Sequence, residues 1–300
     1  MAVELLRVEN VCQSFGHHTA VDHVSFSLLE GEVLGLVGES GSGKTTLGRC
    51  IMGLYRPQEG HITFRGHSLS GGARKRSLAH RAAGSASPIQ MIFQDPMASL
   101  DPRMTVGESV AEGLWTRGLR DKAKIREKVA ETLELVGLQP TLAGRYPHEF
   151  SGGQRQRIGI ARALVMEPQL LIADEAVSAL DVSVQAQVIN LLGDLRQQMK
   201  LSILFIAHDL AVVKYICDRI AVMHMGKIVE LAPADALFAQ PLHPYTKSLL
   251  SAIPIPDPRL ERQRQQLAYE PPPPADRQLQ EVTPSHFVLC SQEEAQIMER

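Results

Sequence analysis

The chain has 300 residues, of which 44% are hydrophobic and 21% are charged. These proportions are ordinary for a folded protein and exclude wholesale disorder. The formal net charge is −2 at pH 7, which argues against a nucleic-acid-binding protein that relies on bulk positive charge. By its length the chain is one large domain or two small ones.

No run approaches the roughly 18 apolar residues that a membrane-spanning helix needs, and the first residues lack the basic and apolar regions of a signal peptide. The four cysteines are scattered and form no CxxC pair; they are Cys12, Cys50, Cys217 and Cys290. We therefore expect reduced structural thiols rather than a disulfide or metal framework.

The first strong pattern is an apolar run at residues 33–37, which predicts a buried strand, followed by a glycine-rich turn and a helix over residues 45–52. Residues 38–45 read GESGSGKT and fit the phosphate-loop pattern GxxxxGK[ST]. Glycines let backbone N–H groups wrap phosphate oxygens, and the helix N-terminus adds a favourable dipole. Lys44 would bridge the β- and γ-phosphates, and the Thr45 hydroxyl would ligate Mg²⁺. The alternative is a glycine-rich loop that only turns the chain.

Two further loops are predicted before the strand that leads to Gln94. Residues 70–76 read SGGARKR, and we interpret them as a solvated basic loop. Residues 82–87 are an extra loop of small residues to which we assign no function.

Residues 95–164 predict a mostly helical block inserted between strand–helix units. Apolar residues recur at helical spacing over residues 121–136, and a second helix is predicted over residues 154–165. Just before that helix, residues 150–157 read FSGGQRQR. Its first turn offers unpaired N–H groups, which make an anion site. Ser151 is also a good N-cap, so an ordinary capped helix start is the alternative, and both can hold.

A second buried strand is predicted over residues 170–173, followed by Asp174 and Glu175, and then by a helix over residues 184–199. Asp174 comes at the carboxyl end of the strand, where α/β sheets place ligands. Asp174 would hold the metal, directly or through water, and Glu175 would act as general base toward the attacking water. The alternative is a solvated acidic turn, which the phosphate loop elsewhere in the chain makes less favourable.

A third strand is predicted over residues 203–207, with a helix over residues 211–217. Three strand–loop–helix units indicate an α/β fold with a parallel sheet. The composition changes near residue 254, because eight of the 18 prolines follow it. We therefore expect a folded body over residues 1–253 and a loosely packed, Pro-rich extension over residues 254–300.

These motifs together resemble the ATP-binding cassette (ABC) family, because an SGGQ sequence lies between a phosphate loop and a strand that ends in Asp-Glu. The resemblance covers about residues 3–253. It implies a P-loop NTPase (RecA-like) core, an N-terminal antiparallel β subdomain, and a nucleotide-binding domain over residues 1–253 with a helical subdomain at about 95–164. The implied cofactors are ATP and Mg²⁺, since no Asn-Lys-x-Asp motif for guanine is present.

The resemblance also assigns residues to the ATP site. Phe15 matches the aromatic residue that stacks on adenine, Gln94 the glutamine that joins the core to the helical subdomain, and His208 the switch histidine. The implied catalytic residues are Glu175, His208 and Gln94. The implied metal ligands are Thr45, Gln94 and Asp174. The implied nucleotide-binding residues are Phe15, Gly38, Glu39, Ser40, Gly41, Ser42, Gly43, Lys44, Thr45, Thr46, Ser151, Gly152, Gly153, Gln154 and Asp181.

Further motifs resemble the dipeptide/oligopeptide/nickel importer ATPases: MIFQDP at residues 91–96, LDVSVQAQ at 180–187 and PLHPYT at 241–246. The last is the most discriminating. Many members carry a cysteine-rich tail that holds an iron–sulfur cluster in some of them. Here prolines 271–274 stand in its place and only Cys290 remains, and one thiolate cannot hold a cluster that needs four ligands, so we expect no iron–sulfur cluster.

The resemblance implies a head-to-tail pair of cassettes, in which Ser151 and Gly153 of one chain cap the γ-phosphate held by the other. We expect the second ABC ATPase subunit to be a paralogue rather than a copy of this chain. Two transmembrane permease subunits and an extracytoplasmic solute-binding protein would complete the importer, and no nucleic acid is expected. The chain would be peripheral, at the cytoplasmic face of the bacterial inner membrane.

The substrate stays open at this point, because di- and oligopeptides, nickel and metal chelates all fit the resemblance. A soluble cassette ATPase that acts on nucleic acid or ribosomes is a different class of protein. Such proteins usually carry two cassettes or a long coiled coil, and this sequence shows one cassette and no long heptad pattern.

Overall fold

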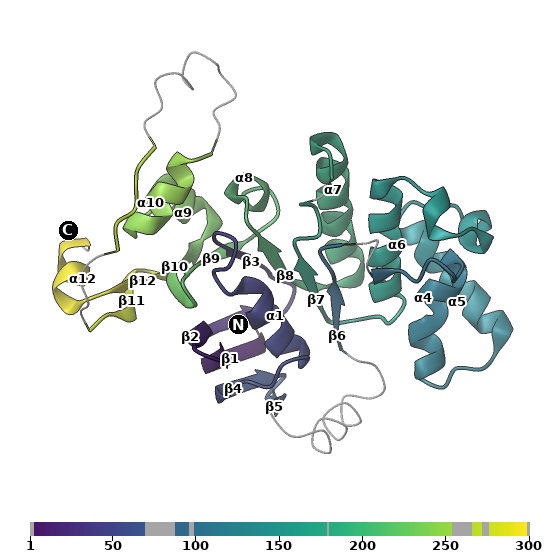
Figure 1. Cartoon of the computed structure of the whole chain (residues 1–300), viewed down its shortest axis with the longest axis horizontal. Coiled ribbons are helices and arrows are strands. Elements are labelled where there is room, and N and C mark those ends of the chain that lie inside the picture. Colours follow the sequence, from purple (N-terminus) through teal and green to yellow (C-terminus); the bar gives the residue numbers. More distant parts are fainter. Residues whose placement is uncertain are drawn as a thin grey trace, which may run out of the picture. The chain divides into compact units, whose positions relative to one another are not determined.

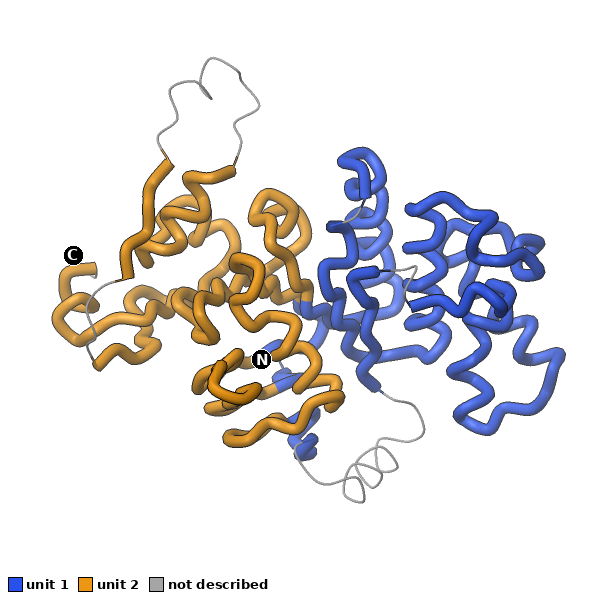
Figure 2. The backbone as a smooth tube through the Cα atoms, in the orientation of Figure 1, with its two compact units in different colours: residues 1–6, 28–32, 63–204 blue, residues 7–27, 33–62, 205–300 orange. Residues whose placement is uncertain are grey.

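The computed structural model describes residues 3–69, 88–95, 99–178, 180–253, 266–271 and 276–298. It divides into two compact units (Figure 2): unit 1 holds residues 1–6, 28–32 and 63–204, and unit 2 holds residues 7–27, 33–62 and 205–300. The predicted loops at residues 70–76 and 82–87 lie outside the described residues.

The N-terminal part of the chain forms a four-stranded sheet, as expected. Its strands are β1 (Glu4–Phe15), β2 (His18–Leu29), β4 (Glu59–Phe64) and β5 (His67–Ser68), in the order β2-β1-β4-β5. A tight turn joins β1 to β2, and Gly16 adopts a left-handed φ of 60° there, a conformation that glycine enters without a Cβ penalty. In the second half of β2 buried and half-buried residues alternate, as in a strand with one face on a core.

Unit 2 contains strands of the main sheet in the order β11-β12-β10-β9-β3. Strands β3 (Val33–Val37) and β9 (Arg219–His224) are parallel, and β10 (Lys227–Pro233) pairs antiparallel with β9. All residues of β3 are buried, which is why the sequence shows an unbroken apolar run. The helices of this unit are α1 (Lys44–Met52), α8 (Leu210–Val213), α9 (Ala234–Ala239), α10 (Pro244–Ser251) and α12 (Gln292–Met298).

The helix predicted over residues 211–217 is shorter than expected. Asp209 caps its start by accepting the Ala211 N–H at 2.8 Å, and the helix ends at Val213. Turns follow, with the Cys217 N–H donating to the Val213 carbonyl at 3.0 Å. β-branched and aromatic residues crowd this segment, and they have low helix propensity.

The expected loose packing of residues 254–300 is wrong for the end of the chain. Strands β11 (Gln278–Thr283) and β12 (His286–Cys290) form an antiparallel hairpin, and β12 pairs with β10 (Figure 1). The residues of this C-terminal hairpin that face inward form a small core with Leu242 and Ala295. The prolines misled the prediction because, from residue 276 on, the only one is Pro284, which lies in the hairpin turn.

An ion pair fixes helix α12 to this hairpin. The Arg277 guanidinium donates to both carboxylate oxygens of Glu294, at 3.1 and 2.9 Å. These hydrogen bonds from Arg277, helped by the Ser291 N–H, lower the pKa of Glu294 from 4.5 to about 2. Because the folded-state pKa is depressed, the stabilisation is present above about pH 4.5 and is lost as the pH falls toward 2.

We therefore expect Arg277→Gln to lower the melting temperature at pH 7, and the difference from the wild type to shrink below about pH 4.5. Thermal unfolding followed by circular dichroism between pH 7 and 3 measures this difference. A difference that stays constant over that range would contradict the ion pair's role.

Unit 1 contains the predicted helical block. The block contains α4 (Val106–Thr116), α5 (Lys122–Leu135), the 3₁₀ turns η1 (Pro140–Gly144) and η2 (Pro147–Glu149), and α6 (Gly152–Leu164). Unit 1 also contains α7 (Val182–Met199), which follows the block in the chain. Figure 1 shows α4, α5 and α6 packed together. Strands β6 (Ile89–Ile92) and β7 (Leu170–Asp174) are parallel neighbours, with Ile92 opposite Ala173. Strand β8 (Ser202–Ala207) carries the chain from unit 1 into unit 2.

None of the helices in the described ranges is long and apolar enough to cross a membrane. The four cysteines, all of which lie in the described ranges, are buried and are not joined in disulfides.

Candidate functional site

The phosphate-loop motif lies in unit 2, between β3 and α1, where it was predicted. Gly38 and Gly43 have positive φ angles of 153° and 104°. A Cβ on Gly38 would lie 2.1 Å from the Met223 carbonyl oxygen, and one on Gly43 would lie 2.0 Å from the Ala20 carbonyl oxygen. Both positions therefore require glycine, since neighbouring backbone leaves no room for a side chain.

Lys44 lies at the centre of the loop and is 3% exposed. Its Nζ donates to the carbonyl oxygens of Gly38 and Glu39, both at 2.7 Å, and to the Ser42 Oγ at 3.2 Å. The Gly226 N–H, in the turn between β9 and β10, donates to the Ser42 carbonyl at 3.0 Å. The loop is thus curled around a buried cation and held by the β9–β10 turn.

The residues of this loop fit a bound phosphate. Helix α1 begins at Lys44, its N-cap residue Gly43 makes no side-chain capping hydrogen bond, and its first turn holds no acidic residue. A helix N-terminus without a capping side chain, next to a lysine, is a site for an anion. The hydroxyls of Thr45 and Thr46 follow in the first turn.

Phe15 and His208 also belong to unit 2. Phe15 ends β1 and is 46% exposed, and its ring meets the edge of Tyr55 with centroids 5.3 Å apart. The Arg49 guanidinium donates to the Tyr55 hydroxyl at 3.2 Å. Phe15 therefore offers an aromatic surface supported by Tyr55, which sequence reasoning did not single out. His208 is exposed and follows β8 directly.

Unit 1 brings Gln94 and Glu175 together. Because β6 and β7 are parallel neighbours, the residues that follow them meet at one edge of the sheet. The Gln94 Nε2 donates to the Glu175 Oε2 at 2.6 Å. Asp174, the last residue of β7, is 2% exposed. Its buried carboxylate has the hard oxygens that Mg²⁺ prefers.

Glu175 adopts a left-handed φ of 47°. This backbone conformation is uncommon for a residue with a side chain, and such strain gathers at functional sites. It turns the chain sharply at the point where the carboxylate meets Gln94.

The SGGQ sequence starts helix α6 of unit 1. The Ser151 Oγ accepts the Gln154 N–H at 3.3 Å, and the Gln154 Oε1 accepts the Ser151 N–H at 3.0 Å, a reciprocal capping box. A Cβ on Gly153 would lie 2.5 Å from the Val184 Cγ1 of α7, whereas at Gly152 the nearest such atom is 3.9 Å away. The capped helix start is therefore present, and Gly153 allows the close approach of α7.

Asp181 is the N-cap residue of α7, and its side chain makes no capping hydrogen bond. The predicted site residues of unit 1 are Gln94, Ser151, Gly152, Gly153, Gln154, Asp174, Glu175 and Asp181. Those of unit 2 are Phe15, His208 and the phosphate loop from Gly38 to Thr46.

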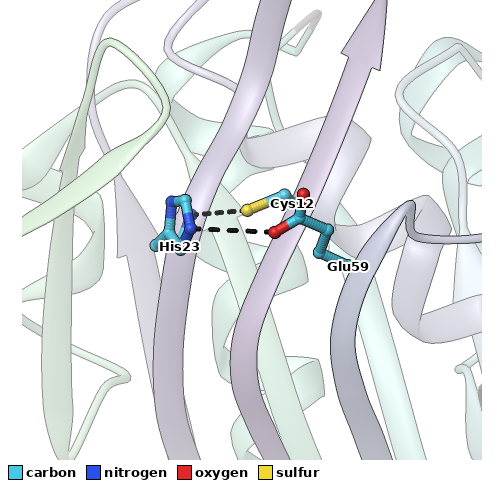
Figure 3. Close-up of side chains that lie close together, drawn as sticks. All are labelled: Cys12, His23 and Glu59. Atoms are coloured by element: carbon cyan, nitrogen blue, oxygen red, sulfur yellow. Dashed lines mark hydrogen bonds and ion pairs between the residues drawn. The ribbon is translucent and has the colours of Figure 1, made fainter.

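A second cluster with metal-ligand atoms lies on the N-terminal sheet, formed by Cys12, His23 and Glu59 (Figure 3). Their ligand atoms all lie within 4.8 Å of one another. The His23 and Glu59 side chains are mostly exposed, and the His23 Nε2 lies 3.9 Å from the Glu59 Oε2. The Cys12 Sγ accepts the His23 backbone N–H at 3.2 Å. Contacts within the cluster therefore account for its geometry without an ion.

Comparisons with known families match two models. The model described as ABC transporter matches residues 21–178. The model described as the C-terminal region of oligopeptide/dipeptide transporters matches residues 229–279.

Two curated relatives resemble almost the whole chain. The oligopeptide transport ATP-binding protein OppF of Bacillus subtilis is 52% identical over 98% of both chains. The dipeptide transport ATP-binding protein DppF of Lactococcus lactis is 51% identical over 95% of this chain and 92% of its own.

Solved structures show the same fold. The structure of cbiO1 from Clostridium perfringens, part of the ABC transporter complex cbiONQ, has a TM-score of 0.71 at 27% identity, covering 79% of this chain and 92% of its own. A dimeric ATP-binding cassette in a post-hydrolysis state, bound to ADP and Pi, has a TM-score of 0.67 at 26% identity, covering 77% of this chain and 99% of its own.

Proposed function

Because this chain belongs to the ABC transporter ATP-binding subunits of the oligopeptide/dipeptide family, we propose that closure of a cassette pair around ATP and Mg²⁺ powers the uptake of peptides. The main support for peptides as the substrate class is the 52% identity to an oligopeptide transport subunit over 98% of the chain. The match of residues 229–279 supports it independently of the ATP-binding motifs.

In this proposal the phosphate loop holds the triphosphate. Lys44 supplies positive charge, and the first N–H groups of α1 donate to phosphate oxygens. The ligands of Mg²⁺ would be Thr45, Asp174 and Gln94. When bound, the ion would neutralise part of the phosphate charge. The donor set fits this ion, since a hydroxyl, a carboxylate and an amide all offer hard oxygens.

Glu175 would take the proton of the attacking water. The Gln94 amide fixes the carboxylate by donating to it at 2.6 Å, and a positioned carboxylate is an effective general base. His208 would contact the γ-phosphate as the switch histidine.

We propose that Ser151, Gly153 and Asp181 act across the cassette pair, together with Gly152 and Gln154. The dimeric state of the similar cassette bound to ADP and Pi supports such a pair. A ligand shifts a two-state equilibrium only through its different affinity for the two states. A γ-phosphate contacted from both chains only in the closed pair supplies that difference. We favour a paralogous cassette as the partner.

Phe15 would stack on adenine, with Glu39, Ser40 and the loop glycines lining the phosphates. We expect Phe15→Ala to weaken ATP binding about five- to tenfold, because base–aromatic stacking is worth about 1–3 kcal/mol and this ring stays half-exposed. Calorimetry with ATP and with inorganic triphosphate distinguishes the roles. Equal losses for both ligands would contradict stacking on the base.

The helical block offers a surface for a permease subunit. A groove of about 560 Å³ lies between α4, α5 and η1, and its lining includes Ala111, Trp115 and Val129. A short apolar helix of a permease fits such a groove, since amphipathic helices bind apolar grooves through one face. We place the chain peripherally at the cytoplasmic face of the bacterial inner membrane, with two permeases and an extracytoplasmic solute-binding protein.

We expect Ala130→Glu, which puts a charge into this groove, to reduce copurification with the permeases at least tenfold while ATP affinity stays unchanged. Ala123→Glu is the matched control, because it lies on the same helix but outside the groove lining. Immunoblots of detergent-solubilised membranes measure the association. Equal association of both variants would exclude the groove as the docking surface.

For the domain organisation, we propose a nucleotide-binding domain over residues 1–253, with its helical subdomain at about 95–164, and a C-terminal extension over 254–300. The match of residues 229–279 to a transporter C-terminal region spans this boundary, and β12 of the extension pairs with β10 of the domain.

Uptake by cells tests the transport function. A strain that lacks this gene should regain uptake of a labelled tetrapeptide when it expresses the wild type, and not when it expresses Glu175→Gln. If the wild type restores uptake of labelled nickel but not of the peptide, the substrate is the metal and the peptide proposal is wrong.

A further inference from the structure

A tyrosine from the C-terminal part of the chain touches the phosphate loop. Tyr245 lies in the first turn of α10 and is 1% exposed. Its hydroxyl accepts the backbone N–H of Glu39 at 3.2 Å. Glu39 is the second residue of the phosphate loop, and its carbonyl accepts the Lys44 Nζ. The peptide groups on both sides of Glu39 are therefore held, one by Tyr245 and one by Lys44.

We propose that Tyr245 is a positioning residue of the phosphate loop, and that the C-terminal hairpin holds Tyr245 in place through a buried pair, Glu230 and His286. This inference rests on the proposed ATP-binding function. It assigns to the C-terminal hairpin a role in ATP affinity.

The Tyr245 ring is held by neighbouring aromatic rings. The His224 ring lies 4.0 Å from it between centroids, and the Tyr269 ring meets it at 5.3 Å in an edge-to-face arrangement. His224 ends β9, next to Met223, whose carbonyl faces Gly38. Rings packed in this way restrict the side chain to one position, so the hydroxyl stays at the loop.

The turn that carries Tyr245 is fixed by a buried carboxylate. Glu230 on β10 is 0% exposed. It accepts the Leu242 N–H at 2.8 Å and the His243 N–H at 3.0 Å. The Tyr245 N–H in turn donates to the His243 Nδ1 at 3.1 Å. Glu230 therefore orients the peptide groups that begin α10.

The C-terminal hairpin completes the surroundings of this carboxylate. The His286 Nε2 lies 2.7 Å from the Glu230 Oε1, and His286 is 4% exposed. A buried carboxylate is tolerated only when donors surround it, and removing one partner is costly. β12, which carries His286, pairs with β10 beside Glu230. The hairpin thus supplies one of the donors that hold Glu230, and through Glu230 it holds the turn of Tyr245.

The protonation states agree with this geometry. Burial lowers the pKa of His243 to about 4, so its Nδ1 can accept the Tyr245 N–H at neutral pH. Burial also raises the pKa of Tyr245, so the hydroxyl keeps its proton.

The Tyr245 contact already holds the loop in the conformation described, so ATP binding does not have to order it. An interaction made equally in the ground state and the transition state changes the affinity for the substrate and leaves kcat unchanged. We therefore expect the effect in the Kd and KM for ATP.

The first test compares full-length Tyr245→Phe with the wild type. The variant keeps the ring and loses only the hydroxyl, and we expect its Kd and KM for ATP to rise about three- to tenfold with kcat within about twofold. Tyr269→Phe is the matched control, because it removes a hydroxyl from the neighbouring ring and leaves the Glu39 contact in place; we expect unchanged affinity. Wild-type affinity in Tyr245→Phe, or a fall in kcat at constant KM, would overturn the proposal.

The second test concerns the hairpin. His286→Leu removes the donor to Glu230, and we expect a similar loss of ATP affinity that the conservative variant His286→Gln partly restores. The double variant with Tyr245→Phe should lose little more than either single variant, because both act through the same hydrogen bond. A lower melting temperature at unchanged ATP affinity in both His286 variants would overturn the hairpin's role.

The failure of the proposed function gives a different result. Lys44→Ala is assayed beside these variants. If the wild type and Lys44→Ala bind ATP equally, the phosphate-loop assignment itself is wrong. If Lys44→Ala loses binding and Tyr245→Phe does not, only the present inference is wrong.

Discussion

Replacing Glu175 with glutamine should lower the rate of ATP hydrolysis about 10²- to 10⁴-fold, the usual contribution of a general base. Glutamine keeps the size of the side chain, and its amide oxygen can still accept the Gln94 N–H that now donates to the carboxylate at 2.6 Å. It cannot take a proton from water at neutral pH. ATP affinity should therefore stay within about threefold, and the cassette pair should be trapped closed.

Single-turnover hydrolysis and equilibrium binding on the same preparation separate these effects. Glu127→Gln is the matched control, because it makes the same chemical change at an exposed position of α5 in the same unit. Hydrolysis by Glu175→Gln at more than about a tenth of the wild-type rate would exclude Glu175 as the general base.

Replacing Lys44 with alanine should weaken ATP binding about ten- to one-hundredfold, since hydrogen bonds to charged groups contribute about 1.5–3 kcal/mol. The ammonium is buried inside the loop and donates to the carbonyls of Gly38 and Glu39. Its removal takes away the positive charge that faces the phosphates. It also leaves the Gly38 and Glu39 carbonyls without the donor that shapes the loop.

Calorimetric titration with ATP measures this loss. Lys124→Ala, on an exposed face of α5, removes a lysine away from the loop and should bind ATP as the wild type does. An unchanged Kd in Lys44→Ala would contradict the phosphate-loop assignment.

The parallel strands could be predicted well from the sequence. The strand predicted over residues 33–37 is observed as Val33–Val37, and the strand predicted over 170–173 extends by one residue, to Asp174. Strands buried on both faces leave unbroken apolar runs, so their signal is local. The phosphate loop is similarly local, because its glycines and Lys44 follow one another in the chain.

Contacts between distant segments could not be predicted. The Gln94–Glu175 contact follows from the parallel pairing of β6 and β7, which no local pattern contains. The hydrogen bond between Tyr245 and Glu39 spans 206 positions of the chain. The PLHPYT sequence was recognised as a family signature, but nothing in it shows that its tyrosine reaches the phosphate loop.

The C-terminal hairpin was missed for a different reason. The alternation of His286, Val288 and Cys290 is a strand signal, and all three residues are buried. Prolines nearby dominated the interpretation. They lie before residue 276 or in the hairpin turn, where proline does not interrupt the hydrogen bonds of a strand.

Purification of tagged Glu175→Gln from its native host tests the central claim most directly. Membranes would be solubilised gently with Mg-ATP present, and the proteins that copurify would be identified by mass spectrometry. We predict two multi-span permeases and a second cassette, which would also show whether the pair is paralogous. Copurification of ribosomes or DNA, with no membrane protein, would contradict the transport function and leave the ATPase site intact.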